Sequence, residues 1–230
     1  MKAPVITVDG PSGVGKGTLA TSLAAELDFH LLDSGALYRA LALVCQRHGV
    51  ELEAVDAAVA LAADLDIAFR SGVADEPAEV LLGGEPIGEA LRSEACGRFA
   101  SRLAAIPAVR EALLARQQAF RRPPGLVADG RDMGTVVFPD AQLKLFLDAS
   151  VEERARRRYK QLIAKGNNAT LPRLIEEISA RDRRDRERSV APLKPAADAV
   201  LVETTGLGIH ALLADALAMA GQRGLRRPGA

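Results

Sequence analysis

Five short apolar segments recur along the chain, each with the length of a buried strand. They are Pro4–Val8, His30–Leu32, Leu126–Ala128, Leu143–Leu147 and Ala199–Val202. The first of them, PVITV, is rich in β-branched residues, which is typical of a parallel strand that is buried on both faces. The pattern therefore predicts five strands of a sheet.

Segments with helical periodicity separate these strands. They are Thr18–Leu27, Gly35–His48, Val109–Arg122, Val151–Ala164, Leu171–Arg188 and Leu207–Ala220. Strands that alternate with helices predict an α/β fold with a doubly wound parallel sheet, whose ligands lie at the carboxyl ends of the strands. Polar clusters follow four of the predicted strands, at Asp9-Gly10, Asp33-Ser34, Asp129 to Asp132 and Asp148. We expect these side chains to gather at one edge of the sheet.

The alternation changes between about Leu65 and Ala95. The segments LDIAFR, AEVLLGG and EPIGEAL have the pattern of short strands joined by turns, and Gly83-Gly84 is a candidate hairpin turn. A minimal α/β core does not need such a hairpin. It is either a surface elaboration or a flap over a second substrate.

A glycine-rich turn, VDGPSGVGKGTLA, joins the first strand to the first helix. A strand, a glycine turn and a helix N-terminus form the context of a phosphate-binding loop. Glycines let backbone N–H groups approach an anion closely, and the helix end adds partial positive charge. Lys16 adds a mobile point charge for the outer phosphates of a nucleotide. The turn therefore predicts a nucleotide site.

The residue after Lys16 affects where a metal ion would bind. Phosphate loops commonly place Ser or Thr there as a ligand of Mg²⁺, whereas this chain has Gly17, followed by Thr18. Either Thr18 binds Mg²⁺, or phosphates and water hold it, which suits an ion that loses its water reluctantly. The sequence therefore does not decide which residues bind Mg²⁺.

Composition argues against several other classes of protein. The 230 residues suffice for one α/β domain with an insertion, and 30 basic residues balance 30 acidic ones. Zero net charge argues against a dedicated duplex-binding protein. An aromatic content of 3% without Trp argues against a stacking platform for single strands. We expect no nucleic-acid partner.

Two further observations indicate the compartment. Cys45 and Cys96 lie far apart without metal-type spacing, which fits small buried thiols in a reducing cytosol. Neither a signal peptide before the first strand nor an apolar run of membrane-spanning length is visible. We therefore expect a cytoplasmic protein that does not bind membranes.

Two segments place charged groups directly after predicted strands. In LLDSGALYR, Ser34 is a suitable helix cap, and Arg39 near it suggests a clamp for a phosphate group. Capping alone would also explain Ser34. In VADGRDMGTVVFPDA, two carboxylates and the guanidinium of Arg131 surround one turn. That arrangement fits either a structural ion pair or a substrate site.

Arginine is concentrated in the later helices. The segment EERARRRYKQ places Arg154, Arg157 and Arg158 within about one helical turn. The segment RDRRDRERS places Arg181, Asp185 and Arg188 on one helix face. Many of these residues fit a solvated helix surface. Guanidinium groups also suit bidentate phosphate contacts, which phosphoryl transfer requires. The histidines are scattered and no nucleophilic triad is visible, as expected for a reaction that depends on positioning and electrostatics.

Four segments together resemble bacterial cytidylate kinase, over about Pro4 to Ala220. They are GPSGVGKGT, LLDSGALYRALAL, ADGRDMGTVVFPDA and RDRRDRERSVAPL. The resemblance implies a P-loop kinase core with a parallel sheet flanked by helices, a small strand-containing insertion for the nucleoside monophosphate and a short lid. The corresponding ranges are 1–64 and 96–220 for the core, about 65–95 for the insertion, about 154–168 for the lid and 221–230 for a frayed tail.

The resemblance also implies transfer of the ATP γ-phosphate to CMP or dCMP with Mg²⁺, in pyrimidine nucleotide metabolism. It assigns ATP to the residues Gly10, Pro11, Ser12, Gly13, Val14, Gly15, Lys16, Gly17 and Thr18. For CMP it assigns Ser34, Arg39 and Arg131 to the phosphate, Ser101, Arg110 and Asp132 to the cytosine, and Arg181, Asp185 and the nearby Arg188 to the ribose. Arg154, Arg157 and Arg158 would cover the transferring phosphoryl group, and the implied catalytic residues are Lys16, Arg131, Arg157 and Arg158.

Other interpretations remain open from the residues alone. The nearest alternative is a phosphate-loop kinase whose acceptor is UMP, AMP or a small hydroxy acid. A nucleotide-binding switch is a different class, but a GTPase would need a guanine-reading Asn-Lys-x-Asp segment, and Leu147-Asp148-Ala149-Ser150 is not one. We expect a monomer that acts on CMP and dCMP.

Overall fold

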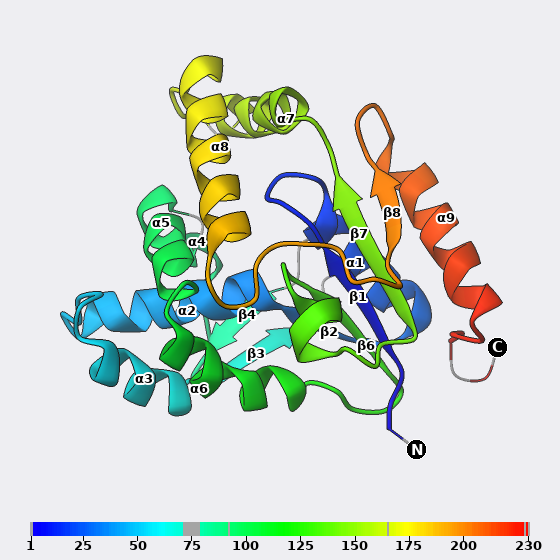
Figure 1. Ribbon diagram of the computed structural model, residues 1–230, viewed down its shortest axis with the longest axis horizontal. Coiled ribbons are helices and arrows are strands. Elements are labelled where there is room, and N and C mark those ends of the chain that lie inside the picture. Colours follow the sequence, from blue (N-terminus) through cyan, green and yellow to red (C-terminus); the bar gives the residue numbers. More distant parts are fainter. Residues whose placement is uncertain (1, 71–78, 92, 165, 228, 230) are drawn as a thin grey trace.

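A parallel sheet forms the centre of the computed structural model, which describes residues 2–70, 79–91, 93–164, 166–227 and 229. Its five strands have the order β2-β6-β1-β7-β8 (Figure 1). They are β1 (Val5–Asp9), β2 (His30–Asp33), β6 (Leu126–Asp129), β7 (Leu143–Asp148) and β8 (Val200–Glu203). All five predicted strands are confirmed. Each ends one residue later than predicted, on an Asp or a Glu.

Helices cover both faces of this sheet. Helices α1 (Lys16–Leu27) and α9 (Ile209–Gln222) pack on one face, where Ile6 and Val8 of β1 point. On the other face Val5 packs against a short π-helix, Met133–Val137. Burial on both sides explains why the strands have continuous apolar sequences rather than alternating ones.

A group of helices lies to the left of the sheet in Figure 1. It contains α2 (Ser34–Arg47), α3 (Val55–Ala63), α5 (Glu94–Leu103) and α6 (Pro107–Gln118), which share one apolar cluster. The predicted helices Gly35–His48 and Val109–Arg122 correspond to α2 and α6, although α6 begins two residues and ends four residues earlier than predicted. Helices α3 and α5 were not predicted. Their buried faces consist largely of small side chains, such as Ala58, Ala62, Cys96 and Ala100, so no stripe of large apolar residues marks them.

The insertion forms a separate antiparallel sheet of β3 (Ile67–Arg70), β4 (Glu79–Leu82) and β5 (Glu85–Pro86). The predicted hairpin turn is confirmed, since Gly83 and Gly84 both have positive φ values between β4 and β5. The prediction that EPIGEAL is a strand was wrong beyond Pro86, because the chain folds into the short helix α4 (Gly88–Leu91). Ile87, which precedes α4, is buried in the apolar cluster of the helices. Residues 71–78 and 92 of the predicted insertion lie outside the described residues.

Helices α7 (Val151–Ala164) and α8 (Leu171–Glu187) stand over the carboxyl edge of the sheet, at the top of Figure 1. The predicted bounds of α7 are confirmed, and α8 ends one residue earlier than predicted. Residue 165 of the predicted lid lies outside the described part of the chain.

The prediction that the chain frays from residue 221 placed the end of the ordered core too early. Helix α9 continues to Gln222, and Leu225 is buried against the core, although residues 228 and 230 fall outside the description. Within the ranges described above, no helix combines the length and apolar character needed to cross a bilayer.

Candidate active site

Three side chains donate hydrogen bonds to carbonyl groups of the glycine turn between β1 and α1. Lys16 Nζ donates to Pro11 O at 2.7 Å, Arg154 Nη1 donates to Ser12 O at 3.1 Å, and Thr204 Oγ1 donates to Val14 O at 3.1 Å. The C=O and N–H of one peptide unit point in opposite directions. The N–H groups of Gly13 and Gly15, which follow the carbonyls of Ser12 and Val14, are therefore directed away from Arg154 and Thr204.

Two glycines of this turn allow approaches that a side chain would prevent. Gly10 has φ 144°, and a Cβ there would lie 2.1 Å from the carbonyl oxygen of Leu147 on β7. Gly13 has φ 82°, and its Cβ would lie 3.3 Å from the Cβ of Arg154 on α7. L-residues rarely adopt these φ values. The turn thus packs directly on β7 and α7.

Each strand of the central sheet ends in a carboxylate, and four of the five accept backbone N–H groups. Asp9 accepts from Met133 and Gly134 at 2.8 Å each, Asp33 from Ala36, Asp148 from Ala149 and Glu203 from Thr205. Asp129 is 8% exposed and accepts no hydrogen bond from any described residue. It is therefore the strand-end carboxylate that is available to a ligand.

Burial changes the charge balance beside the glycine turn. It raises the pKa of Asp129 to about 7, although Lys16 opposes that shift. Burial also lowers the pKa of Lys16 to about 7, with Arg131 acting in the same direction. An isolated charge is costly to bury. A bound polyphosphate would remove that cost for Lys16 by supplying negative charge.

A pocket lies beside the glycine turn. Its walls come from α2, α5, α6, the turn after β6, and α8. Its lining contains all nine residues that the family resemblance assigned to CMP. These are Ser34, Arg39, Ser101, Arg110, Arg131, Asp132, Arg181, Asp185 and Arg188. Tyr38, Gly35, Ala100, Ala104 and Gly130 complete the lining. The structure therefore brings together side chains from segments up to 154 residues apart, since the lining runs from Ser34 to Arg188.

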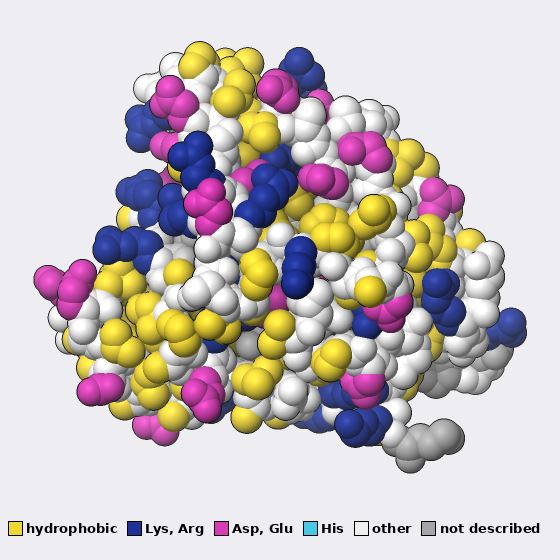
Figure 2. All heavy atoms as spheres, viewed as in Figure 1, with side chains coloured by type: hydrophobic (Ala, Val, Ile, Leu, Met, Phe, Trp, Pro, Cys, Tyr) yellow, Lys and Arg dark blue, Asp and Glu magenta, His cyan; other side chains and the backbone are white. Residues whose placement is uncertain are grey.

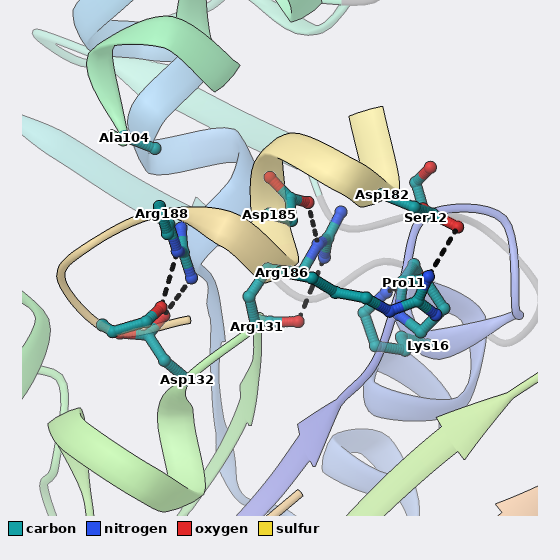
Figure 3. A network of polar contacts seen from close by, with 12 residues as sticks. Pro11, Ser12, Lys16, Ala104, Arg131, Asp132, Asp182, Asp185, Arg186 and Arg188 are labelled. Atoms are coloured by element: carbon teal, nitrogen blue, oxygen red, sulfur yellow. Dashed lines mark hydrogen bonds and ion pairs between the residues drawn. The ribbon is translucent and has the colours of Figure 1, made fainter. Parts of the chain in front are cut away.

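Ion pairs organise the charged groups of this pocket. Asp132 pairs with Arg110 and lies 3.6 Å from Arg188, while Arg131 Nε donates to Asp185 at 3.1 Å (Figure 3). Burial raises the pKa of Asp185, but the nearby arginines outweigh this effect and hold it below its usual range. More arginine charge than carboxylate charge faces the pocket. On the face shown in Figure 2, Lys and Arg side chains gather over α7 and α8.

Several buried polar atoms in this pocket make no hydrogen bond within the described structure, although Arg188 Nη2 lies 3.6 Å from Asp132 Oδ1. Among the described residues, five buried side chains have a polar atom without a hydrogen bond, and four of these five line the pocket. They are Tyr38 Oη, Ser101 Oγ, Arg181 Nε and Arg188 Nη2. Leaving such atoms unsatisfied costs about 1–3 kcal/mol each. Their convergence indicates a polar ligand that satisfies them.

Sequence reasoning missed two residues of the site. Tyr38 lies four positions after Ser34 on α2, and its ring faces the guanidinium of Arg110, with 5.9 Å between the ring centroid and Cζ. Gln117 of α6 is 1% exposed and accepts a hydrogen bond from Ser34 Oγ at 3.0 Å. The helical spacing of Tyr38 was a usable signal. The signal for Gln117 was weak: it is a polar residue four positions after the apolar Leu113, on the same face of α6.

The arginines of α7 differ in their surroundings. Arg157 donates to Thr204 O at 2.6 Å and to Glu153 at 2.9 Å, and Arg158 pairs with Glu94 of α5. Arg154 is only 1% exposed and is committed to Asp182 and to backbone carbonyls. In the described structure the donors of Arg154 thus already have partners inside the protein, which argues against the expectation that it covers the phosphoryl group.

The comparison with known proteins shows the family of the chain. The family model described as cytidylate kinase matches residues 6–222. The chain is 58% identical to a cytidylate kinase from Aeromonas hydrophila subsp. hydrophila over 221 residues, which cover 96% of this chain and 95% of that protein. It is 56% identical to a cytidylate kinase from Pseudomonas savastanoi pv. phaseolicola, with 98% of each chain covered.

A solved structure of an uncharacterized protein from Eubacterium ventriosum has a similar fold. Its TM-score is 0.51 at 12% sequence identity, with 96% of this chain and 99% of that chain covered. This likeness concerns the fold alone.

Proposed function

The chain belongs to the cytidylate kinase family, and from this membership and the geometry of the site we propose that it transfers the γ-phosphoryl group of ATP to CMP or dCMP. The products are ADP and CDP or dCDP. The observation that carries the proposal is the convergence of four buried polar atoms that lack a hydrogen bond among the described residues, together with an excess of arginine, on one pocket beside the phosphate loop.

The reaction needs two phosphate groups brought together in a dry, positively charged site. In the proposal, the glycine turn and Lys16 bind the outer phosphates of ATP. Ser34, Arg39 and Arg131 bind the CMP phosphate, whose oxygen attacks the γ-phosphorus while the bond to the β-phosphate oxygen breaks. The γ-phosphoryl group joins CMP, and ADP leaves. Arg131 is close to both sites. Its charge helps to lower the pKa of Lys16 in the phosphate loop, and its Nε donates to Asp185 in the CMP pocket. Charge neutralisation by such groups supplies most of the catalysis in phosphoryl transfer.

The ligands proposed for CMP fit their chemistry. Cytosine has an exocyclic amino donor, which Asp132 can accept, and two acceptors, which Arg110 and Ser101 can satisfy. Arg181 and Asp185 offer a donor and an acceptor to the ribose hydroxyls. Both Ser101 Oγ and Arg181 Nε lack a partner among the described residues, so each has hydrogen-bonding capacity to give.

Mg²⁺ fits the donor set at the phosphate loop. It prefers oxygen ligands and keeps much of its water. Asp129 is the strand-end carboxylate without a hydrogen bond in the described structure, and Thr18 is exposed at the start of α1. We propose that these two residues hold Mg²⁺, directly or through water, with ATP oxygens as the other ligands. The ion would neutralise charge on the transferring phosphoryl group.

The decisive experiment is an assay of ADP release from ATP with Mg²⁺ and one acceptor at a time. We expect strong turnover with CMP and dCMP, weak turnover with UMP, and none with AMP or without an acceptor. Equal turnover without an acceptor, or preference for AMP, would overturn the proposal. When variants of the pocket are assayed in the same way, Arg173→Ala is the control. Arg173 is 75% exposed on α8 and pairs only with Glu177 in the described structure.

We propose that the insertion and the lid close over the bound substrates. We expect the segment of about 65–95 to enclose CMP and that of about 154–168 to cover the phosphoryl group, with Arg157 and Arg158 in reach of it. In the described structure Arg158 pairs with Glu94 at the start of α5, so it would have to leave that pair to reach the phosphoryl group. A monomer that acts in the cytoplasm without nucleic acid stays a prediction.

A further inference from the structure

We propose that Arg154 and Asp182 are positioning residues that couple the ATP phosphate loop to the CMP pocket. This inference rests on the proposed function, because it concerns how the two substrate sites of that reaction affect one another. Neither residue lines the CMP pocket, and neither is proposed to touch a reacting atom. Their role would be to make a displacement of the phosphate loop move α8, and a displacement of α8 move the loop.

The pair is completely enclosed. Arg154 is 1% exposed and Asp182 is 2% exposed. The guanidinium binds the carboxylate in a fork, with Nη1 to Oδ1 at 3.1 Å and Nη2 to Oδ2 at 2.6 Å. Such a bidentate pair fixes the relative orientation of both groups as well as their distance. Helices α7 and α8 are therefore joined by a contact with a single well-defined geometry.

The same guanidinium also holds the phosphate loop. Its Nη1 donates to Ser12 O at 3.1 Å and its Nε donates to Ala149 O at 3.0 Å. Gly13 packs on the stem of this side chain, since a Cβ at Gly13 would lie 3.3 Å from the Cβ of Arg154. A displacement of the loop must therefore displace Arg154. Figure 3 shows Asp182 close to Ser12 of the loop.

At its other end the pair is continuous with the CMP pocket. Asp182 follows Arg181 directly in α8 and precedes Asp185 by three residues, and both of these line the pocket. Residues three apart lie on neighbouring positions of a helix surface. A rotation or shift of α8 that moves Asp182 thus also moves Arg181 and Asp185. Close-packed interiors transmit such displacements because they have little room to absorb them.

The consequence is reciprocal. When ATP phosphates fix the loop, Arg154 and Asp182 should fix α8 in the orientation that binds CMP, and CMP should fix the loop in the same way. If ATP tightens CMP binding by some factor, CMP must tighten ATP binding by the same factor. A pair with a purely structural role would stabilise the fold without contributing to that factor.

The test is titration calorimetry of CMP with and without a non-hydrolysable ATP analogue and Mg²⁺. In the unmodified protein we expect the analogue to tighten CMP binding about fivefold or more. In Asp182→Asn, each ligand should still bind alone, but the tightening factor should fall toward one. Arg154→Lys should behave similarly, because a lysine keeps the charge but cannot reach Asp182, Ser12 O and Ala149 O together. Arg173→Ala on the same helix should keep the full factor.

The outcomes separate the inference from the proposed function. If the unmodified protein binds CMP and the analogue without mutual tightening, or if a folded Arg154→Lys or Asp182→Asn variant retains the full factor, the inference is overturned. If the unmodified protein binds no CMP at all, the proposed function fails instead. Thermal unfolding of each variant confirms that it is folded, and Arg154→Lys provides the answer should Asp182→Asn fail to fold.

Discussion

Arg110 and Asp132 form an ion pair inside the proposed CMP pocket, with only 8% and 5% of their side chains exposed. Burial raises the pKa of Asp132, and Arg110 is the group that opposes this shift most strongly. The carboxylate has about four acceptor positions. The pair with Arg110 and the approach of Arg188 leave room for a further donor, such as the amino group of cytosine.

We therefore predict that Asp132→Asn narrows the preference for CMP over UMP. The carboxylate accepts from the cytosine amino group and repels the uracil carbonyl, whereas an amide can satisfy either. A hydrogen bond to a charged group contributes about 1.5–3 kcal/mol, so the ratio of kcat/KM for CMP and UMP should fall about tenfold or more. Steady-state kinetics with both acceptors measure it. Asp140→Asn, at a half-exposed surface position, should leave the ratio unchanged. An unchanged ratio in Asp132→Asn would remove Asp132 from base selection.

Arg181→Met should stabilise the protein while it weakens catalysis. Burial lowers the pKa of Arg181 to about 10, with Arg131 adding to the effect, so the folded state disfavours its charge relative to the unfolded chain. Removing that charge should raise the free energy of unfolding by about 1–3 kcal/mol. The same change should lower kcat/KM for CMP and dCMP about ten- to a hundredfold. Urea unfolding and kinetics test the two parts. Unchanged Michaelis constants would contradict the ribose role, and Arg173→Met serves as the exposed control.

Gly97→Ala should impair CMP binding without destabilising the fold. Gly97 lies inside α5, and a Cβ there would lie 2.8 Å from Nη2 and 3.0 Å from Nη1 of Arg39. Alanine favours a helix by about 1 kcal/mol over glycine, so α5 should form at least as well. The end of Arg39 must move, however, and KM for CMP should rise severalfold while KM for ATP changes little.

The matched control for that variant is Gly88→Ala in α4, where a Cβ would meet no atom within 4 Å. It should leave both Michaelis constants unchanged. If Gly97→Ala also had no effect on KM for CMP, the position of Arg39 seen here would not matter for phosphate binding.

ATP binding should take up a proton near pH 8. Burial lowers the pKa of Lys16 to about 7, so at pH 8 this amine is mostly neutral before ATP binds. Bound phosphates favour the charged form and raise the pKa again, so uptake should approach about one proton per ATP at pH 8. At pH 6 the amine is already charged, and its uptake should be small. Calorimetry in buffers of different ionisation enthalpy measures the number. Binding enthalpies that do not depend on the buffer at pH 8 would contradict it.

Sequence patterns identified the central architecture and most of the proposed site. The strands of the sheet follow from local apolar runs, and the phosphate loop follows from four glycines and Lys16 at fixed spacing. The nine substrate residues, from Ser34 to Arg188, came from the family resemblance, and the structure places all of them around one pocket. Helices α3 and α5 escaped prediction because small residues such as Ala58 and Ala100 bury little area and leave a weak periodic signal.

The amino-acid sequence by itself determined where the strands end and which side chains lie there, since both depend on neighbouring residues. The tertiary structure alone decided which of these side chains are already occupied. Asp9 and Asp129 end adjacent strands and look alike in sequence, yet only Asp9 is satisfied by backbone N–H groups, of residues more than 120 positions away. Arg154 looks like its neighbours in α7 until Asp182 and Ser12, 28 and 142 positions distant, take its donors. Such pairings depend on how separate elements pack, because a hydrogen bond is decided by the position of both partners and a local pattern contains only one.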